Sequence, residues 1–167
     1  MSISLSDLPL AVADYVKNNI TVDVSEVKHG ISSVLQPHEK GTFNVTVTNN
    51  GSVRLTDLVF ELSVSPTSVA KLISPEGTVI FALDAIGGNP IPNGNEVDKL
   101  FLTGIEALTW TSVDGGAAVT TPDLQIKTQA TLGDATIKCT LHATVDQASL
   151  FPAEQEGSVS KRKLTVS

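Results

Sequence analysis

Apolar and polar residues alternate along short stretches of this chain, most clearly over residues 41–49. Every second position there is apolar, and asparagine or threonine stands between: Phe43, Val45 and Val47 against Asn44, Thr46 and Thr48. A period of two puts successive side chains on opposite faces of a strand, so the pattern predicts a half-buried antiparallel strand. The Asn-Asn-Gly that follows predicts a turn, because both residue types tolerate positive φ.

Leu55–Ser65 alternates in the same way and predicts the next strand, whose inward face carries Leu58, Phe60, Leu62 and Val64. A tight hairpin turn at Asn50 and Gly51 would put Arg54 on the same face as Val47. That hairpin would bury an arginine near the core. We therefore predict that the chain crosses here to the opposite sheet, which is the usual connection in immunoglobulin-like domains.

Other short apolar or alternating stretches predict the remaining strands. Gly, Pro, Asn and Asp separate them, and they cover Ile20–Val24, part of 31–35, 69–73, 78–83, 97–102, 108–113 and 159–166. Residues 84–96 form the longest irregular stretch, because two prolines and three glycines there exclude regular structure.

Residues 124–145 predict the clearest β-hairpin. Apolar residues take alternate positions through 124–132 and again through 135–145. Gly133-Asp134 between them is the Gly-X signature of a two-residue type II′ turn. Such a turn pairs Leu132 with Ala135, and both belong to the apolar sets.

The N-terminal residues follow a different period. Leu8, Val12 and Tyr15 recur at helical spacing, and Pro9 suits a first helical turn. We predict a short helix or arm over residues 1–18. So short a helix must pack on something, either capping one end of the sandwich or docking on a neighbouring subunit.

These elements together predict an all-β fold: a two-sheet antiparallel immunoglobulin-like β-sandwich with a short N-terminal helix or arm. The sandwich is expected to form a single domain over residues 19–167. A chain of 167 residues is long enough for one such domain with a full core.

The net charge is −7 and the sequence pI is about 4.8. An acidic chain repels phosphate, so we predict that this protein does not bind nucleic acid. The basic run Lys161-Arg162-Lys163 suits a charged strand edge that resists edge-to-edge pairing, or a local anionic contact. No apolar stretch is long enough to span a bilayer, so we expect no membrane insertion. The first residues lack a signal-peptide pattern, which leaves retention, leaderless export and prior removal of a leader all open.

One cysteine, Cys139, excludes an intramolecular disulfide. His142 lies three residues away, but on a strand the two side chains point to opposite faces and cannot form a nucleophile–base pair. Cys139 is predicted to be a small buried hydrophobe, and His142 to face solvent.

Two loop regions contain potential metal ligands. His29 and His38 lie near Glu26 and Glu39, but the spacing matches no known zinc pattern and predicts an ordinary polar loop.

The second region, residues 84–98, is rich in oxygen ligands and is a candidate calcium loop. Its spacing is not that of an EF-hand, and turn chemistry accounts equally well for its residues, which are Asp84, Asn89, Asn93, Asn95, Glu96 and Asp98.

Signatures of catalysis are missing from the sequence. It has no Gly-x-Ser-x-Gly elbow and no phosphate-cradling glycine loop, so no catalytic residue and no cofactor is predicted. Aromatic residues make up 4% of the chain, and Trp110 is predicted to lie in the core, which disfavours an aromatic sugar-binding platform.

The segment GTFNVTVTNNG at residues 41–51, followed by LTDLVFELSV from Leu55, resembles the opening of immunoglobulin-like modules of bacterial and archaeal proteins. These include the cell-adhesion-related bacterial domain and the NPCBM-associated domain of glycosidases. In these modules the B strand ends in V-x-N-x-G and the C strand begins with L-x-x-V. The resemblance implies a spacer, an adhesion element or an accessory to a carbohydrate-active enzyme.

Two function classes follow. The first is a non-catalytic structural or assembly protein that contacts protein partners or copies of itself through sheet edges and termini. The alternative is an adhesion or ligand-binding module, carbohydrate-associated and calcium-supported, that uses the loop at residues 84–98. An enzyme would need a pocket that gathers ionisable groups, for example His29 or His38 with an acid and a nucleophile.

Overall fold

The computed structural model describes residues 19–52, 54–75, 80–104, 113–145 and 155–166. Within these ranges the chain forms strands, turns and loops. The strands are β1 (Ile20–Val24), β2 (Val34–Leu35), β3 (Lys40–Phe43), β4 (Val45–Asn49), β5 (Leu55–Ser65), β6 (Ala70–Ile73), β7 (Ile80–Leu83), β8 (Glu96–Val97), β9 (Lys99–Gly104), β10 (Ala118–Thr120), β11 (Leu124–Thr128), β12 (Gly133–Val145) and β13 (Gln155–Val166). Three predictions fall wholly or partly outside the described residues: the helix over 1–18, the strand over 108–113 and the core position of Trp110.

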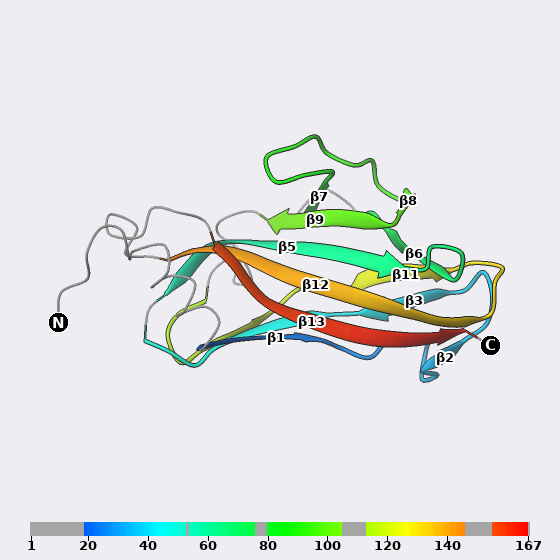
Figure 1. The fold of residues 1–167 in the computed structure, drawn as a ribbon, viewed down its shortest axis with the longest axis horizontal. Coiled ribbons are helices and arrows are strands. Elements are labelled where there is room, and N and C mark those ends of the chain that lie inside the picture. The colour runs from blue at the N-terminus through cyan, green and yellow to red at the C-terminus, as the bar shows by residue number, and fades with distance from the viewer. Residues whose placement is uncertain (1–18, 53, 76–79, 105–112, 146–154, 167) are drawn as a thin grey trace.

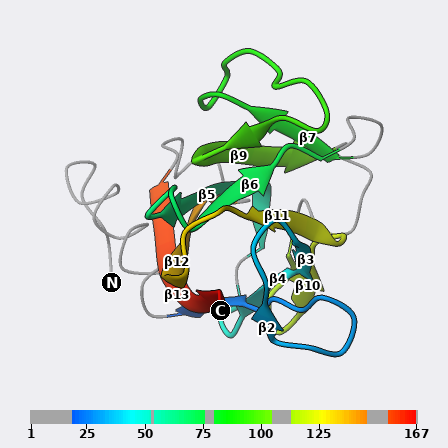
Figure 2. The same cartoon turned by 90° about the vertical axis from the view of Figure 1, so that its right-hand side faces the viewer.

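The strands form two layers, which confirms the predicted β-sandwich. One layer is a six-stranded sheet in the order β2-β13-β12-β5-β9-β7, and Figure 1 looks onto its central strands. The other consists of two sheets, β1-β4-β10 and β3-β11-β6-β8, which meet where β3 runs into β4. Figure 2 shows β5, β12 and β13 on one side and β3, β4, β10 and β11 on the other. The described pairings are antiparallel except for β2 with β13, which is parallel.

The core lies between the layers and is built from alternate strand positions. Buried positions include Val45 and Val47 on β4, Leu58, Phe60, Leu62 and Val64 on β5, and Ile137, Cys139 and Leu141 on β12. Burial of each large apolar side chain stabilises the fold by about 1.5–3 kcal/mol, before the loss of conformational entropy is counted. The predicted inward face of Leu55–Ser65 is confirmed.

The prediction of one unbroken strand over residues 41–49 is wrong. The chain bends at Asn44, so that β3 pairs with β11 whereas β4 pairs with β1 and β10. Side chains hold the bend: Asn44 Nδ2 donates to Asp123 Oδ1 at 2.9 Å, and Asn44 N donates to Ser25 Oγ at 2.8 Å. Phe43 and Val45 are both buried on either side of the bend, so the period of two continues through it.

The predicted crossing after β4 is confirmed, because β5 pairs with β12 and β9 in the other layer. Asn49 organises the exit from β4. Its buried side chain accepts a hydrogen bond from Gly51 N at 3.0 Å and donates to Val113 O at 3.4 Å. Arg54 remains exposed and pairs with Asp114 at 3.1 Å, as the argument against a hairpin required.

The predicted hairpin over residues 124–145 is wrong. β11 pairs with β3 and β6, whereas β12 pairs with β13 and β5 in the other layer. Leu132 is 60% exposed instead of facing Ala135, which pairs with Leu164. Each strand keeps one apolar face in either arrangement, so the hydrophobic pattern did not distinguish a hairpin from a crossing between layers.

Candidate functional site

A group of polar and aromatic side chains occupies the outer face of the six-stranded sheet, the face that points away from the other layer. The sheet order brings β12, β5 and β9 side by side, with Glu61 in register between Thr140 and Phe101. Glu61 therefore stands at the centre of this face. His142 and Lys99 lie diagonally from it on the neighbouring strands, and we call Glu61, Lys99, Phe101 and His142 the Glu61 cluster.

Glu61 is held by one partner on each carboxylate oxygen. Glu61 Oε1 lies 3.0 Å from His142 Nε2, and Glu61 Oε2 lies 3.1 Å from Lys99 Nζ. Partial burial of Glu61 acts to raise its pKa. The hydrogen bonds from His142 and Lys99, together with their charges, outweigh that effect and leave the pKa of Glu61 below its ordinary value. The carboxylate is thus kept ionised and fixed in orientation.

Phe101 packs against both side chains that bind Glu61. Lys99 Nζ lies 5.3 Å from the centroid of the Phe101 ring, within the range of a cation–π contact. The rings of Phe101 and His142 lie 6.5 Å apart between centroids at an interplanar angle of 41°. Phe101 is only 8% exposed although it projects from the outer face. The cluster is therefore partly dry and rigid.

The position of His142 corrects one prediction. His142 does lie on the face opposite Cys139, as strand alternation requires, but its side chain is only 14% exposed rather than open to solvent. Glu61 and Phe101 on the neighbouring strands cover it. His142 could be placed on the outer face from the sequence, but its partners could not, because they depend on the sheet order.

Cys139 is a buried thiol on the inner face of β12, as predicted. Burial, and to a lesser degree the negative charge of Glu61, raises the pKa of Cys139 to about 12. The thiolate is the reactive form of cysteine, so this side chain serves as a core residue.

The predicted polar loop brings together only some of its titratable residues. His29 Nε2 lies 2.9 Å from Glu39 Oε2, and His29 Nδ1 lies 2.7 Å from Lys40 O. His38 and Glu26 are exposed and do not join this pair. Among the described residues, no group of three or more His, Cys, Asp or Glu side chains is placed to hold a metal ion.

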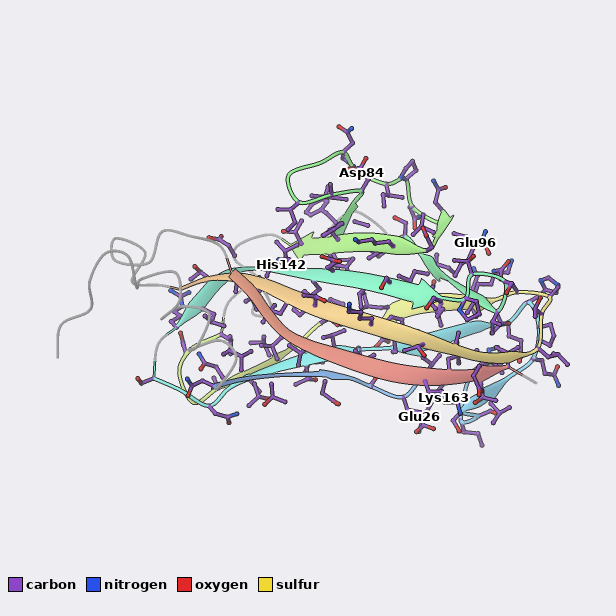
Figure 3. The ribbon with its side chains drawn as sticks, in the orientation of Figure 1. Glu26, Asp84, Glu96, His142 and Lys163 are labelled. Carbon is purple, nitrogen blue, oxygen red and sulfur yellow. The ribbon has the colours of Figure 1, made fainter. Side chains whose placement is uncertain are left out.

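The oxygen-rich residues of 84–98 do not share one set of contacts but bond to separate partners. Asp84 Oδ1 accepts a hydrogen bond from Asn89 N at 2.9 Å, while Glu96 Oε1 accepts one from Gln129 Nε2 at 2.7 Å. Asn93 and Asp98 are exposed. Figure 3 shows Asp84 on the loop after β7 and Glu96 apart from it, at the start of β8. A calcium site here stays a prediction.

Sequence reasoning missed two other polar residues because they act inside the fold. Thr128 is fully buried and donates to Gln36 O at 2.5 Å while accepting from Glu39 N at 2.8 Å. Asn49 holds the exit from β4. Both lie in stretches whose alternation predicted strand structure, and nothing in that pattern marks a polar residue that bonds to a distant loop.

A small apolar cavity lies between the layers, lined by residues that include Phe43, Leu62, Leu72 and Leu100. Its volume of about 10 Å³ leaves room for one water molecule at most. The cavity is therefore a packing gap rather than a ligand pocket.

No helix in the described part of the chain is long and apolar enough to cross a membrane. No protein-family model matches the sequence, and no curated protein matches it.

Solved structures do resemble the fold. A cohesin module from the family 33 glycoside hydrolase of Clostridium perfringens is 8% identical, with a TM-score of 0.53, and the match covers 89% of this chain and 95% of that chain. One chain of the CaDoc0917–CaCohA2 complex is 17% identical with a TM-score of 0.50, over 88% and 100% of the two chains. AvmM, which catalyses macrocyclization in alchivemycin A biosynthesis, is 13% identical with a TM-score of 0.50, over 90% and 89%. At such identities the likeness is one of fold alone.

Proposed function

We propose that this chain is a non-catalytic protein-interaction module that contacts another protein, or a second copy of itself, through the outer face of its six-stranded sheet. The Glu61 cluster is the observation that carries the proposal. It sets the half-exposed Lys99 and the Glu61 carboxylate beside an aromatic ring that is itself only 8% exposed. Aromatic side chains with rigid, partly dry charged neighbours are typical centres of binding energy at protein interfaces.

The geometry of the cluster favours recognition over catalysis. Both oxygens of Glu61 already have hydrogen-bond partners, so the carboxylate is a poor general base. The single thiol of the chain, that of Cys139 on β12, lies on the opposite face of the sheet, and its pKa is raised to about 12. A partner would instead meet a preorganised surface, which lowers the entropy cost of binding.

The comparisons support the proposal through likeness of fold. One similar fold is named as a cohesin module of a glycoside hydrolase, and another occurs in a complex of two proteins. The similarity to AvmM, a named catalyst, keeps the enzyme alternative in view. An enzyme function would require a reactive group beside the Glu61 cluster.

The test compares the whole chain with a Lys99→Glu variant. We measure self-association by size-exclusion chromatography with light scattering over rising concentration, and the stoichiometric partner that copurifies from the native source. We expect an assembly or a defined complex that Lys99→Glu weakens, because reversal of this charge disrupts the cluster and its potential. Arg54→Glu, the same charge change at an exposed residue between β4 and β5, is the matched control.

Two results would remove support for the proposal. One is a chain that remains monomeric at high concentration and copurifies with no partner. The other is an assembly that Lys99→Glu and Arg54→Glu weaken equally, because that effect would follow net charge rather than this face.

The alternative is ligand or adhesive binding at residues 84–98. Loops at the end of a sandwich commonly carry recognition, and Asn93, Asn95 and Glu96 are exposed there. Calcium is the ligand that this oxygen-rich stretch would suit, and its effect on thermal stability tests the alternative.

A further inference from the structure

Three lysines stand side by side on the outer face of the other layer. In the four-stranded sheet, Lys127 on β11 pairs in register with Lys40 on β3 and with Lys71 on β6. Paired residues on neighbouring strands share a face, with their Cβ atoms about 4.5–5.5 Å apart. We call Lys40, Lys71 and Lys127 the lysine row. The sequence separates its members by at least 31 positions, so only the sheet order reveals it.

The surroundings neutralise this row only in part. Lys28 adds a fourth positive charge, because it bridges to Thr42 in the adjacent row of the same face. Glu96 on β8 is the acidic neighbour, with Oε2 at 3.9 Å from Lys127 Nζ and Oε1 already bonded to Gln129. Asp98, just beyond β8, is a second acid at the edge. Within the described residues, no ion pair is recorded for the amino groups of Lys28, Lys40 or Lys71.

Such a row is unfavourable for the isolated chain. Like charges directly opposite each other across strands destabilise a sheet. The cost is notable in a chain of net charge −7, where acidic residues are plentiful but do not occupy these positions. An anionic partner would reduce the repulsion among the lysines of the free protein, and this would make the free energy of binding more favourable.

We infer that the outer face of β3, β11 and β6 is a docking surface for an acidic protein segment, whose carboxylates lie against the lysine row. Three adjacent strands span about 10 Å, the reach of a few residues of extended peptide. Carboxylate side chains at alternate positions of such a segment would face the row. This surface lies on the layer opposite the Glu61 cluster, and the inference does not depend on the proposed function.

Two other anionic partners fit the surface less well. A nucleic acid would carry many phosphates past the acidic remainder of the chain and would be repelled by it. The described outward positions of β3, β11 and β6 also offer no aromatic ring on which a base could stack. A symmetric contact between two copies of this chain through this face would set one lysine row against the other, so a second copy is not the occupant.

The experiment measures binding of a fluorescent glutamate-rich peptide to the full chain by anisotropy, at low and at physiological ionic strength. The variant Lys71→Glu/Lys127→Glu reverses two charges of the row. The matched control, Lys138→Glu/Lys163→Glu, makes the same change of net charge at exposed residues on the outer face of the other layer, outside the Glu61 cluster. Melting curves establish that each variant is folded, and Lys71→Gln/Lys127→Gln replaces the reversal if it fails to fold.

We expect the peptide to bind at low salt and to weaken as salt screens the contact. The row reversal should weaken binding by about tenfold or more, and the control by much less. Equal loss in both variants, or no measurable binding by the wild type, would overturn the inference. Tighter row-dependent binding of an oligothymidylate or of phosphatidylserine vesicles would overturn it as well, because the occupant would then be a nucleic acid or a membrane.

Discussion

Glu61 and His142 lie on neighbouring strands of the six-stranded sheet, and their side chains meet at 3.0 Å on its outer face. The contact is diagonal across the pairing of β5 with β12, where Glu61 is in register with Thr140. Lys99 reaches the other oxygen of the same carboxylate from β9. One side chain therefore connects three strands that are distant in the sequence.

Acid should weaken the fold in part through Glu61. The pKa of Glu61 lies below its ordinary value of 4.5. The ionised carboxylate therefore stabilises the fold fully above pH 4.5, and this stabilisation is lost as the pH falls through the lowered pKa. Glu61→Gln should cost about 1 kcal/mol at neutral pH, a value reduced for partial exposure. The difference from wild type in urea-unfolding free energy should shrink below about pH 4.5.

The control for this effect is Asp114→Asn, because Asp114 pairs with Arg54 at a far more exposed position. It should change stability little at any pH. Asp134, whose pKa is lowered mainly by hydrogen bonds from Lys163 and Thr165, titrates in both the wild type and the Glu61 variant and cancels from their difference. A pH-independent cost of Glu61→Gln would contradict the assigned role.

Cys139 should be unreactive in the folded protein. Its side chain is fully buried, and the pKa of its thiol is raised to about 12. We expect negligible reaction with a thiol-specific disulfide reagent at mildly alkaline pH, and reaction of one thiol per chain in denaturant. Rapid modification without denaturant would show that β12 opens locally.

Thr128 should contribute to stability through its hydroxyl. The group donates to Gln36 O and accepts from Glu39 N, and so ties the loop before β3 to the end of β11. Thr128→Val keeps the shape but leaves both backbone groups without this partner, at a cost of about 1–3 kcal/mol. Thr120→Val is the matched control, because Thr120 is exposed and its hydroxyl bonds to the hydroxyl of Thr46 on the neighbouring strand. Equal effects of the two changes on urea unfolding would contradict the prediction.

Calcium should leave the melting temperature unchanged. The carboxylate of Asp84 is engaged with Asn89, and that of Glu96 with Gln129 and Lys127. A calcium site needs several of these oxygens to converge on one point. Thermal melting in chelator and in millimolar calcium checks the prediction. A rise in melting temperature that Asp84→Asn abolishes would favour the ligand-binding alternative instead.

Several conclusions follow from the sequence without the fold. The alternation in Leu55–Ser65 predicted its inward face, because side-chain direction in a strand depends only on the backbone period. The burial of Cys139 and its separation from His142 followed from the same rule. The crossing after β4 could also be predicted, because the charge of Arg54 excluded the competing hairpin.

Strand partners, in contrast, were decided by the tertiary structure. The apolar face of β12 would suit β11, β13 or β5 equally, so a plausible turn at Gly133 predicted the wrong neighbour. The bend at Asn44 depends on hydrogen bonds to Ser25 and Asp123, which lie far away in the sequence. The Glu61 cluster and the lysine row likewise arise only when strands from different parts of the chain become neighbours. A periodic sequence determines which way each side chain points, but which side chains meet depends on sheet order and register, and many orders satisfy the same period.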